Sequence, residues 1–111
     1  MNVKEYHAHL YYSEENLEVA KQVVEKAREF GLFSIGRIHE RLVGPHPMWS
    51  CQLLFKNDEL PKAMPWILEN REGLIIFMHP DTGNDLEDHT DHAIWIGGKV
   101  DLNLEVFKRG N

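Results

Sequence analysis

The stretch that decides the fold is YHAHLYY, residues 6–12. Successive side chains in an extended strand alternate between two faces, and residues two apart stand roughly 6.6 Å apart on one face. One face of this stretch carries polar and aromatic rings: His7, His9 and Tyr11. The opposite face carries Ala8 and Leu10. We therefore predict a strand over residues 3–12 that packs one face into a core and presents two imidazoles on the other.

A helix is predicted directly after this strand. Apolar residues recur there at helical spacing: Leu17, Ala20, Val24 and Ala27. Ser13 is predicted as the N-cap, because its hydroxyl can accept from a free backbone N–H and two glutamates follow it. Gly31 is predicted as the C-cap. The first two elements are thus a strand and a helix.

Further strands and a second helix follow from the same patterns. The strands are predicted at 34–43, 49–56, 74–78 and 93–97. Pro65 lacks an N–H, which is harmless only among the first four residues of a helix, so the second helix is predicted to start near Pro61 or Lys62. The polar segment 79–92 is predicted as a long loop.

The resulting order is β-α-β-β-α-β with one added strand, which is typical of the ferredoxin-like α+β sandwich. We expect a single domain over residues 1–111, with two helices on one face of an antiparallel sheet and the first and third strands at its centre. The other sheet face then needs a cover. We expect a homodimer, arranged as a dimeric α/β barrel, that encloses a ligand chamber on that face.

Composition narrows the partners. The chain has 111 residues, a formal net charge of −6 and a single cysteine, Cys51. A negative net charge without a cluster of basic residues argues against a nucleic-acid partner. The sequence also lacks a long apolar run that would predict a membrane partner. One cysteine allows no internal disulfide, and we predict it as a core residue. A reducing, cytoplasmic setting is expected.

Seven histidines are unusual in so short a chain, and they fall into recognisable motifs. The motifs are H-A-H at 7–9, G-P-H-P at 44–47, H-P-D-T-G at 79–83 and D-H-T-D-H at 88–92. Imidazole binds iron, zinc, copper or nickel, and a following proline holds His46 and His79 by restricting the backbone. Each motif alone is also compatible with an ordinary strand, turn or solvated loop. Together they predict a metal or ligand site on one face.

These motifs, with G-R-I-H-E-R-L-V-G-P-H-P-M and P-W-I-L-E-N-R-E-G-L between them and A-I-W-I-G at the end, resemble the DOPA 4,5-dioxygenase family. The resemblance runs from about Tyr6 to Gly97. It implies a ferredoxin-like domain and an extradiol dioxygenase that cleaves a catechol ring with O2 and non-haem Fe(II). Zinc is a second metal that the same imidazoles would bind.

We predict His7, His9 and His79 as metal ligands, with His46 and His92 as acid/base or substrate-orienting groups. A two-histidine, one-carboxylate site is usual for such iron, but a three-histidine site fits the sequence equally. The candidate carboxylates are Asp81, Asp85, Glu87, Asp88 and Glu40. A weaker prediction is that Arg37 and Arg41 attract a substrate carboxylate.

Two other functions remain open from the sequence. The open sheet face alone is compatible with a dimeric ferredoxin-like module that binds a metal or small ligand without turnover. Hydrolytic or isomerase chemistry at zinc in the same pocket is the other alternative. Dependence on reduced iron and consumption of O2 separate the dioxygenase from both.

Overall fold

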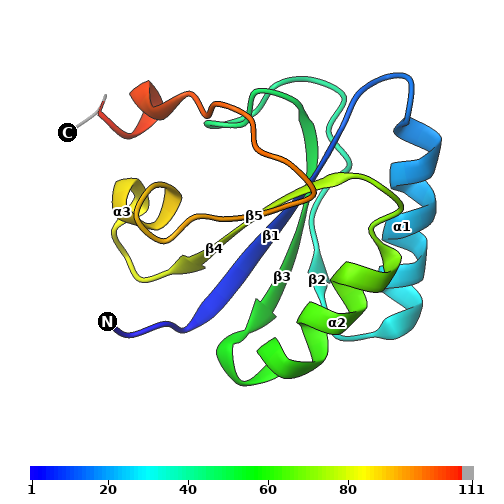
Figure 1. The fold of residues 1–111 in the computed structure, drawn as a ribbon, viewed down its shortest axis with the longest axis horizontal. Coiled ribbons are helices and arrows are strands. Elements are labelled where there is room, and N and C mark those ends of the chain that lie inside the picture. The colour runs from blue at the N-terminus through cyan, green and yellow to red at the C-terminus, as the bar shows by residue number, and fades with distance from the viewer. Residues whose placement is uncertain (109–111) are drawn as a thin grey trace.

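The computed structural model describes residues 1–108, which form an α+β domain with one five-stranded antiparallel sheet and three α-helices (Figure 1). The strands are β1 (Glu5–Tyr12), β2 (Ser34–Ile35), β3 (Trp49–Lys56), β4 (Ile75–Asp81) and β5 (Ile94–Ile96). The helices are α1 (Leu17–Phe30), α2 (Leu60–Asn70) and α3 (Asp85–His89). Short 3₁₀ turns cover Asn57–Glu59 and Leu104–Phe107.

The sheet has the order β2-β3-β1-β4-β5, and each neighbouring pair is antiparallel. β1 is therefore the middle strand, with β3 on one side and β4 on the other. Its register places His7 opposite His79 of β4, and His9 opposite Phe77 of β4 and Gln52 of β3. Because side chains alternate along a strand, this register fixes which residues meet on each face.

One face of the sheet packs against α1 and α2, which lie together on the same side (Figure 1). The core there is made by alternate residues of β1, namely Ala8, Leu10 and Tyr12, with apolar side chains of both helices and of β3 and β4. α1 buries Ala20, Val23, Val24 and Ala27 and ends at Gly31, whose φ of 78° is the left-handed conformation predicted for its C-cap. No helix within residues 1–108 is long and apolar enough to cross a membrane.

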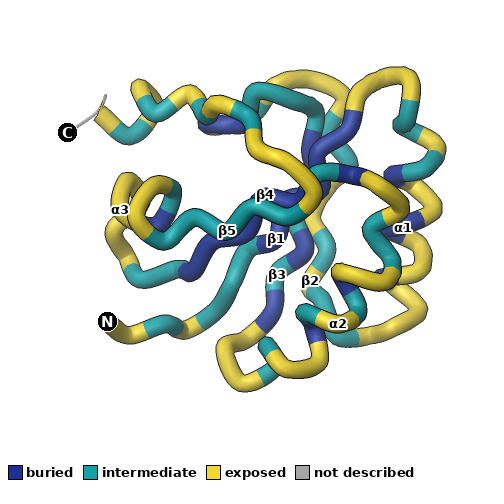
Figure 2. Tube along the Cα trace, viewed as in Figure 1, coloured by how far each residue is buried: buried dark blue, intermediate teal, exposed yellow. Residues whose placement is uncertain are grey.

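The second sheet face is covered by the same chain, which differs from the open face expected from the sequence. α3 and the C-terminal segment lie on that side (Figure 1). His9, Tyr11, Phe77 and His79 retain 5%, 1%, 0% and 3% of their exposure, and the inner strands are mostly dark blue in Figure 2. His9 of β1 is thus buried within one subunit, whereas His7 stays partly exposed.

The predicted strand over 34–43 is wrong beyond its first two residues. Only Ser34 and Ile35 pair with β3, and the chain from Gly36 to Met48 is irregular. The prediction rested on Ile38 and Leu42 sharing a face, but Leu42 is 63% exposed. An edge segment with exposed charges and little apolar area to bury gains little from a continued ladder.

The predicted loop over 79–92 is also wrong in part, since β4 continues through Asp81 and α3 follows at Asp85–His89. A proline usually ends a buried strand, yet Pro80 is a strand residue here. β5 pairs only with Ile76–Met78, so β4 has a single strand neighbour at this point and tolerates proline. Asn84 caps α3 by accepting from the backbone N–H of Glu87.

Two helix starts differ from prediction. Asn16, not Ser13, precedes α1, and the Asn16 side chain accepts from both the backbone N–H and the hydroxyl of Ser13. α2 starts at Leu60, so Pro65 lies inside the helix rather than in its first four residues. Pro61 and Pro65 are both exposed, which leaves the unpaired carbonyl one turn before Pro65 beside water.

We predict that Leu10→Ala lowers the free energy of unfolding by about 2–5 kcal/mol, because Leu10 is 1% exposed and sits opposite the buried Cys51 and Ile76. Urea titration followed by circular dichroism measures the change. Leu68→Ala is the matched control, since Leu68 is 56% exposed and its replacement should cost well under 1 kcal/mol. Equal effects at the two positions would contradict the assigned core.

Candidate metal centre

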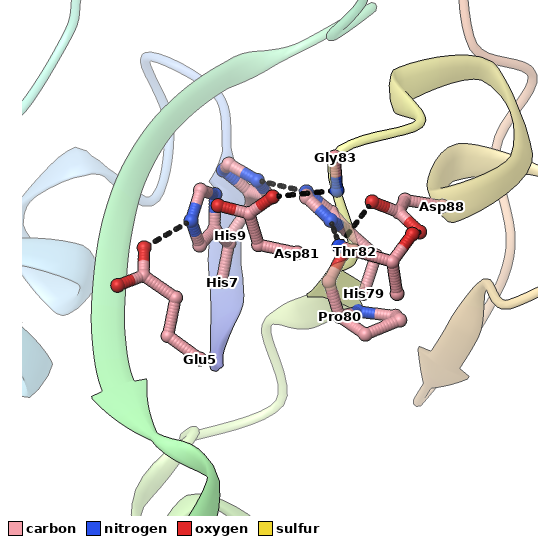
Figure 3. Close-up of polar contacts among 9 residues, drawn as sticks. All are labelled: Glu5, His7, His9, His79, Pro80, Asp81, Thr82, Gly83 and Asp88. Atoms are coloured by element: carbon pink, nitrogen blue, oxygen red, sulfur yellow. Dashed lines mark hydrogen bonds and ion pairs between the residues drawn. The ribbon is translucent and has the colours of Figure 1, made fainter. Parts of the chain in front are cut away.

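Three histidine side chains meet on the sheet face opposite α1 and α2. His7 and His79 face each other across β1 and β4, and His9 follows two residues along β1. One ligand atom from each ring lies within 4.8 Å of the other two. Figure 3 shows these rings gathered between the two strands. The structure therefore brings together the three residues predicted as ligands, in a group that could hold a metal ion.

The two most buried rings approach each other through their Nε2 atoms. His9 Nε2 and His79 Nε2 lie 3.1 Å apart. Two nitrogens that each lie about 2.1 Å from one ion, at a right angle, are roughly 3.0 Å apart. The two rings are hydrogen-bonded to each other in this structure, and their nitrogens are close to the spacing of two imidazoles that bind one metal.

Backbone contacts set the orientation and protonation of the rings. His79 Nδ1 lies 2.9 Å from the carbonyl oxygen of Pro80, so Nδ1–H donates and the lone pair of the neutral ring is on Nε2. His89 repeats this arrangement, because its Nδ1 lies 2.6 Å from the carbonyl oxygen of Asp85. A lone pair held at Nε2 is the form that a metal or a proton requires.

His46 reaches the same cluster from the irregular segment before β3. Its ring centroid lies 4.1 Å from that of His9, and its Nδ1 lies 2.7 Å from the hydroxyl of Tyr11. Tyr11 is buried, and its hydroxyl can either donate to His46 Nδ1 or accept from it, so the free Nε2 of neutral His46 carries the proton in one tautomer and the lone pair in the other. His46 can therefore act as a donor or an acceptor, whereas His79 and His89 offer acceptors.

Burial keeps these imidazoles neutral. Desolvation is the main cause that lowers the pKa of His46 and of His79 to about 4, and the neighbouring histidines reinforce it. The pKa of His9 is lowered well below its usual value, first by burial and then by His46, His79 and His7. Burial also lowers the pKa of His89. Neutral imidazole is the form that binds a metal, so burial favours the metal-binding form of His9 and His79 near neutral pH.

Two carboxylates lie beside the cluster. Glu5 Oε2 is 3.0 Å from His7 Nε2, and Glu5, His7 and Asp81 form a second group with ligand atoms within 4.8 Å of one another. Asp81 was one of the predicted carboxylates, whereas Glu5 was missed. The strand alternation that selected His7 and His9 also puts Glu5 on their face, so the signal was present in the sequence.

The other predicted carboxylates have different positions. Asp88 is 1% exposed and accepts from both the backbone N–H and the hydroxyl of Thr82, at 2.8 and 2.5 Å, which ties α3 to the end of β4 (Figure 3). Asp85 lines the cavity described below, while Glu87 lies 3.8 Å from His92. Glu40 is exposed and outside that lining.

The histidine cavity, which we define by its lining, has a volume of about 200 Å³. It is lined by His7, His9, His46, Gln52, His79, Asp81, Asp85, Asp88 and His89. The ring of His89 packs against that of His79 at a tilt of 37°, with centroids 4.0 Å apart. His92, predicted in the acid/base role, is not in this lining. Sequence reasoning placed His89 in the D-H-T-D-H motif but assigned it no role, because the short helix that carries it was predicted as loop.

An aromatic floor supports the cluster. Phe77 is fully buried opposite His9, and its ring lies within 6.3 Å of His9, His46, His79 and His89, centroid to centroid. Trp95 of β5 stacks on Phe77 at 4.5 Å. Apolar rings below a set of imidazoles exclude water and strengthen electrostatic interactions within the site.

Comparison with known proteins places this arrangement in a family. The model of the Dopa 4,5-dioxygenase family matches residues 6–106. The chain belongs to this family. A curated family relative from Amanita muscaria, named DOPA 4,5-dioxygenase, is 29% identical over 92% of this chain and 49% of its own length.

Two further similar proteins have names that do not specify a substrate. An uncharacterised 21.2 kDa protein from Botryotinia fuckeliana is 34% identical over 91% of this chain and 62% of its own length. The chain thus spans about half to three-fifths of these curated relatives. A crystal structure from Nostoc punctiforme, provisionally named a dioxygenase, superposes with a TM-score of 0.92 at 34% identity, over 96% of this chain and 93% of that one.

We predict that His9→Ala weakens binding of Fe(II) or Zn(II) by about 100-fold or more, because it removes a ligand from the centre of the group. Competition with a chromophoric chelator under anaerobic conditions measures the affinity. His92→Ala is the matched control and should change the affinity less than twofold, since its ring contacts Glu87 instead. Equal losses in both variants would contradict the assigned ligands.

The metal-free protein should lose stability as the pH falls below 6.5. His46 has a pKa of about 4 when folded and about 6.5 when unfolded, so the unfolded chain binds more protons between these values. At pH 5 this group alone costs up to about 2 kcal/mol relative to pH 7.5. Urea titrations of wild type and His46→Gln at both pH values test this.

The variant should show a smaller pH-dependent loss than the wild type, whatever its stability at pH 7.5. An identical pH dependence in the two proteins would show that His46 is not held neutral by the fold.

Proposed function

We propose that this chain is a dioxygenase that cleaves the ring of a catechol with O2 at a non-haem iron bound by histidines. The observation that carries the proposal is the His7, His9 and His79 group, whose ligand atoms lie within 4.8 Å of one another beside a cavity of further neutral histidines. Membership of the Dopa 4,5-dioxygenase family supports the same reaction.

The residues fit such a metal. His7, His9 and His79 would hold the metal through their ring nitrogens, and non-haem iron sites with three protein ligands keep positions open for substrate. Glu5 and Asp81 beside His7 add negative charge that balances a divalent cation. When bound, Fe(II) would supply the redox chemistry that joins a catechol to O2.

The surrounding residues handle protons and orientation. A catechol must lose a hydroxyl proton to become electron-rich, and His89, whose Nδ1–H is held by the Asp85 carbonyl, offers Nε2 as the acceptor. His46, fixed by Tyr11, would donate its Nε2–H to a substrate oxygen in the tautomer whose Nδ1 accepts from the Tyr11 hydroxyl. We thus assign acid/base work to His46 and His89, in place of the sequence-based pair His46 and His92.

The same proposal includes the assembly and setting predicted from the sequence. The strand order β2-β3-β1-β4, with β5 added at the edge, supports a ferredoxin-like description. Dimerisation and a cytoplasmic location stay predictions. Because α3 and the C-terminal segment already cover the histidine face, a dimer would narrow the chamber entrance rather than create the chamber.

Oxygen uptake tests the function. Anaerobically Fe(II)-loaded protein should consume O2 and form a yellow ring-opened product from L-DOPA, caffeate, protocatechuate or 4-methylcatechol. His89→Ala should lower kcat by about 100-fold or more, while His92→Ala should retain most activity. Stoichiometric iron binding without O2 uptake on any catechol would replace the proposal with a binding module. Activity with zinc alone would favour hydrolytic or isomerase chemistry.

A further inference from the structure

A second cavity adjoins the histidine cavity on the side of β3. It has a volume of about 200 Å³ and shares His9, His46 and Gln52 with the histidine cavity. Its own wall includes Arg37, His39 and Ser50. We call it the arginine cavity. A molecule with one end at the metal-binding histidines would reach it by passing His46.

The backbone on both sides of Arg37 is fixed to β3. The N–H of Gly36 donates to the Gln52 carbonyl at 2.8 Å, and the N–H of His39 donates to the Ser50 carbonyl at 3.0 Å. The Tyr12 hydroxyl donates to the His39 carbonyl at 2.8 Å. Arg37 therefore extends from a short segment with three anchors, although this segment left the regular ladder after Ile35.

The charge of the arginine cavity differs from that of its neighbours. Its lining contains no acidic residue, and no ion pair of Arg37 is found within residues 1–108. The histidine cavity has three aspartates in its wall, and a third cavity of about 450 Å³, which meets it at His89, carries both Lys99 and Asp101. Among these three cavities of residues 1–108, the arginine cavity is the one whose lining carries a permanent cation and no acidic residue.

We propose that Arg37 is a specificity-determining residue that binds the carboxylate of a catechol whose ring lies in the histidine cavity. This inference rests on the proposed function and narrows its substrate class to catechols with an anionic substituent. A guanidinium matches a carboxylate with two parallel hydrogen bonds, and the aspartates on the other side repel the same group. The two cavities together therefore orient the substrate in one direction.

The kinetic test compares substrates with and without the charge. Arg37→Gln should raise KM for protocatechuate by about tenfold, the loss expected for one charge-assisted contact, and change KM for 4-methylcatechol less than twofold. Arg41→Gln is the matched control, because Arg41 is an exposed arginine of the same segment outside all three cavities. Arg37→Lys should recover part of the loss, since it restores the charge but not the planar fork.

A binding measurement separates this inference from the function. In metal-free protein, protocatechuate should shift the Nε–Hε NMR signal of one arginine, identified by its absence in Arg37→Gln, and 4-methylcatechol should not. If no catechol is turned over but this signal shifts selectively, the carboxylate site stands and the dioxygenase does not. Two results would overturn the assignment. In the first, Arg37→Gln changes KM equally for protocatechuate and 4-methylcatechol. In the second, Lys99→Gln rather than Arg37→Gln removes the preference for protocatechuate.

Discussion

The antiparallel register of β1 against β4 is the constraint on which the site depends. It sets His7 opposite His79 and His9 opposite Phe77, so that two strands far apart in sequence form one triangle of imidazoles above an aromatic floor. A slip of one residue would send the β1 histidines into the apolar layer under α1 and α2. The core on that side, through Leu10 and its neighbours, therefore fixes the site as well as the fold.

Burial then gives the histidines their chemistry. Four imidazoles lie close together and are partly or fully buried: His9, His46, His79 and His89. Desolvation, with repulsion between neighbouring imidazolium charges, lowers the pKa of each ring, so these rings stay neutral at a pH where a solvated histidine begins to take up protons. The Nδ1 atoms of these rings have different hydrogen-bond partners. Nδ1 of His79 and Nδ1 of His89 each contact a backbone carbonyl oxygen, and Nδ1 of His46 contacts the phenol of Tyr11. The same residue type can thus provide both acceptors and a donor within one site.

The sequence predicted the features that strand alternation, helix periodicity and the Gly31 C-cap determine, and its predictions were wrong where tertiary contacts decide the structure. β1, α1, β3 and the face shared by His7 and His9 followed from periodicity alone. The inward position of His89 depends on α3, a helix of five residues held by Asp88 and Thr82, too short to leave a periodic signal. The segment after Ile35 has the alternating pattern of a strand, but it buries too little apolar surface to stabilise one.

Anomalous diffraction from crystals of the anaerobically Fe(II)-loaded protein tests the central claim most directly. Data collected above and below the iron absorption edge should give one strong peak within bonding distance of ring nitrogens of His7, His9 and His79, with the cavity toward His46 and His89 left free for substrate. A peak beside Glu87 and His92, or no ordered peak in protein that holds one iron per chain, would contradict the metal centre and the function built on it.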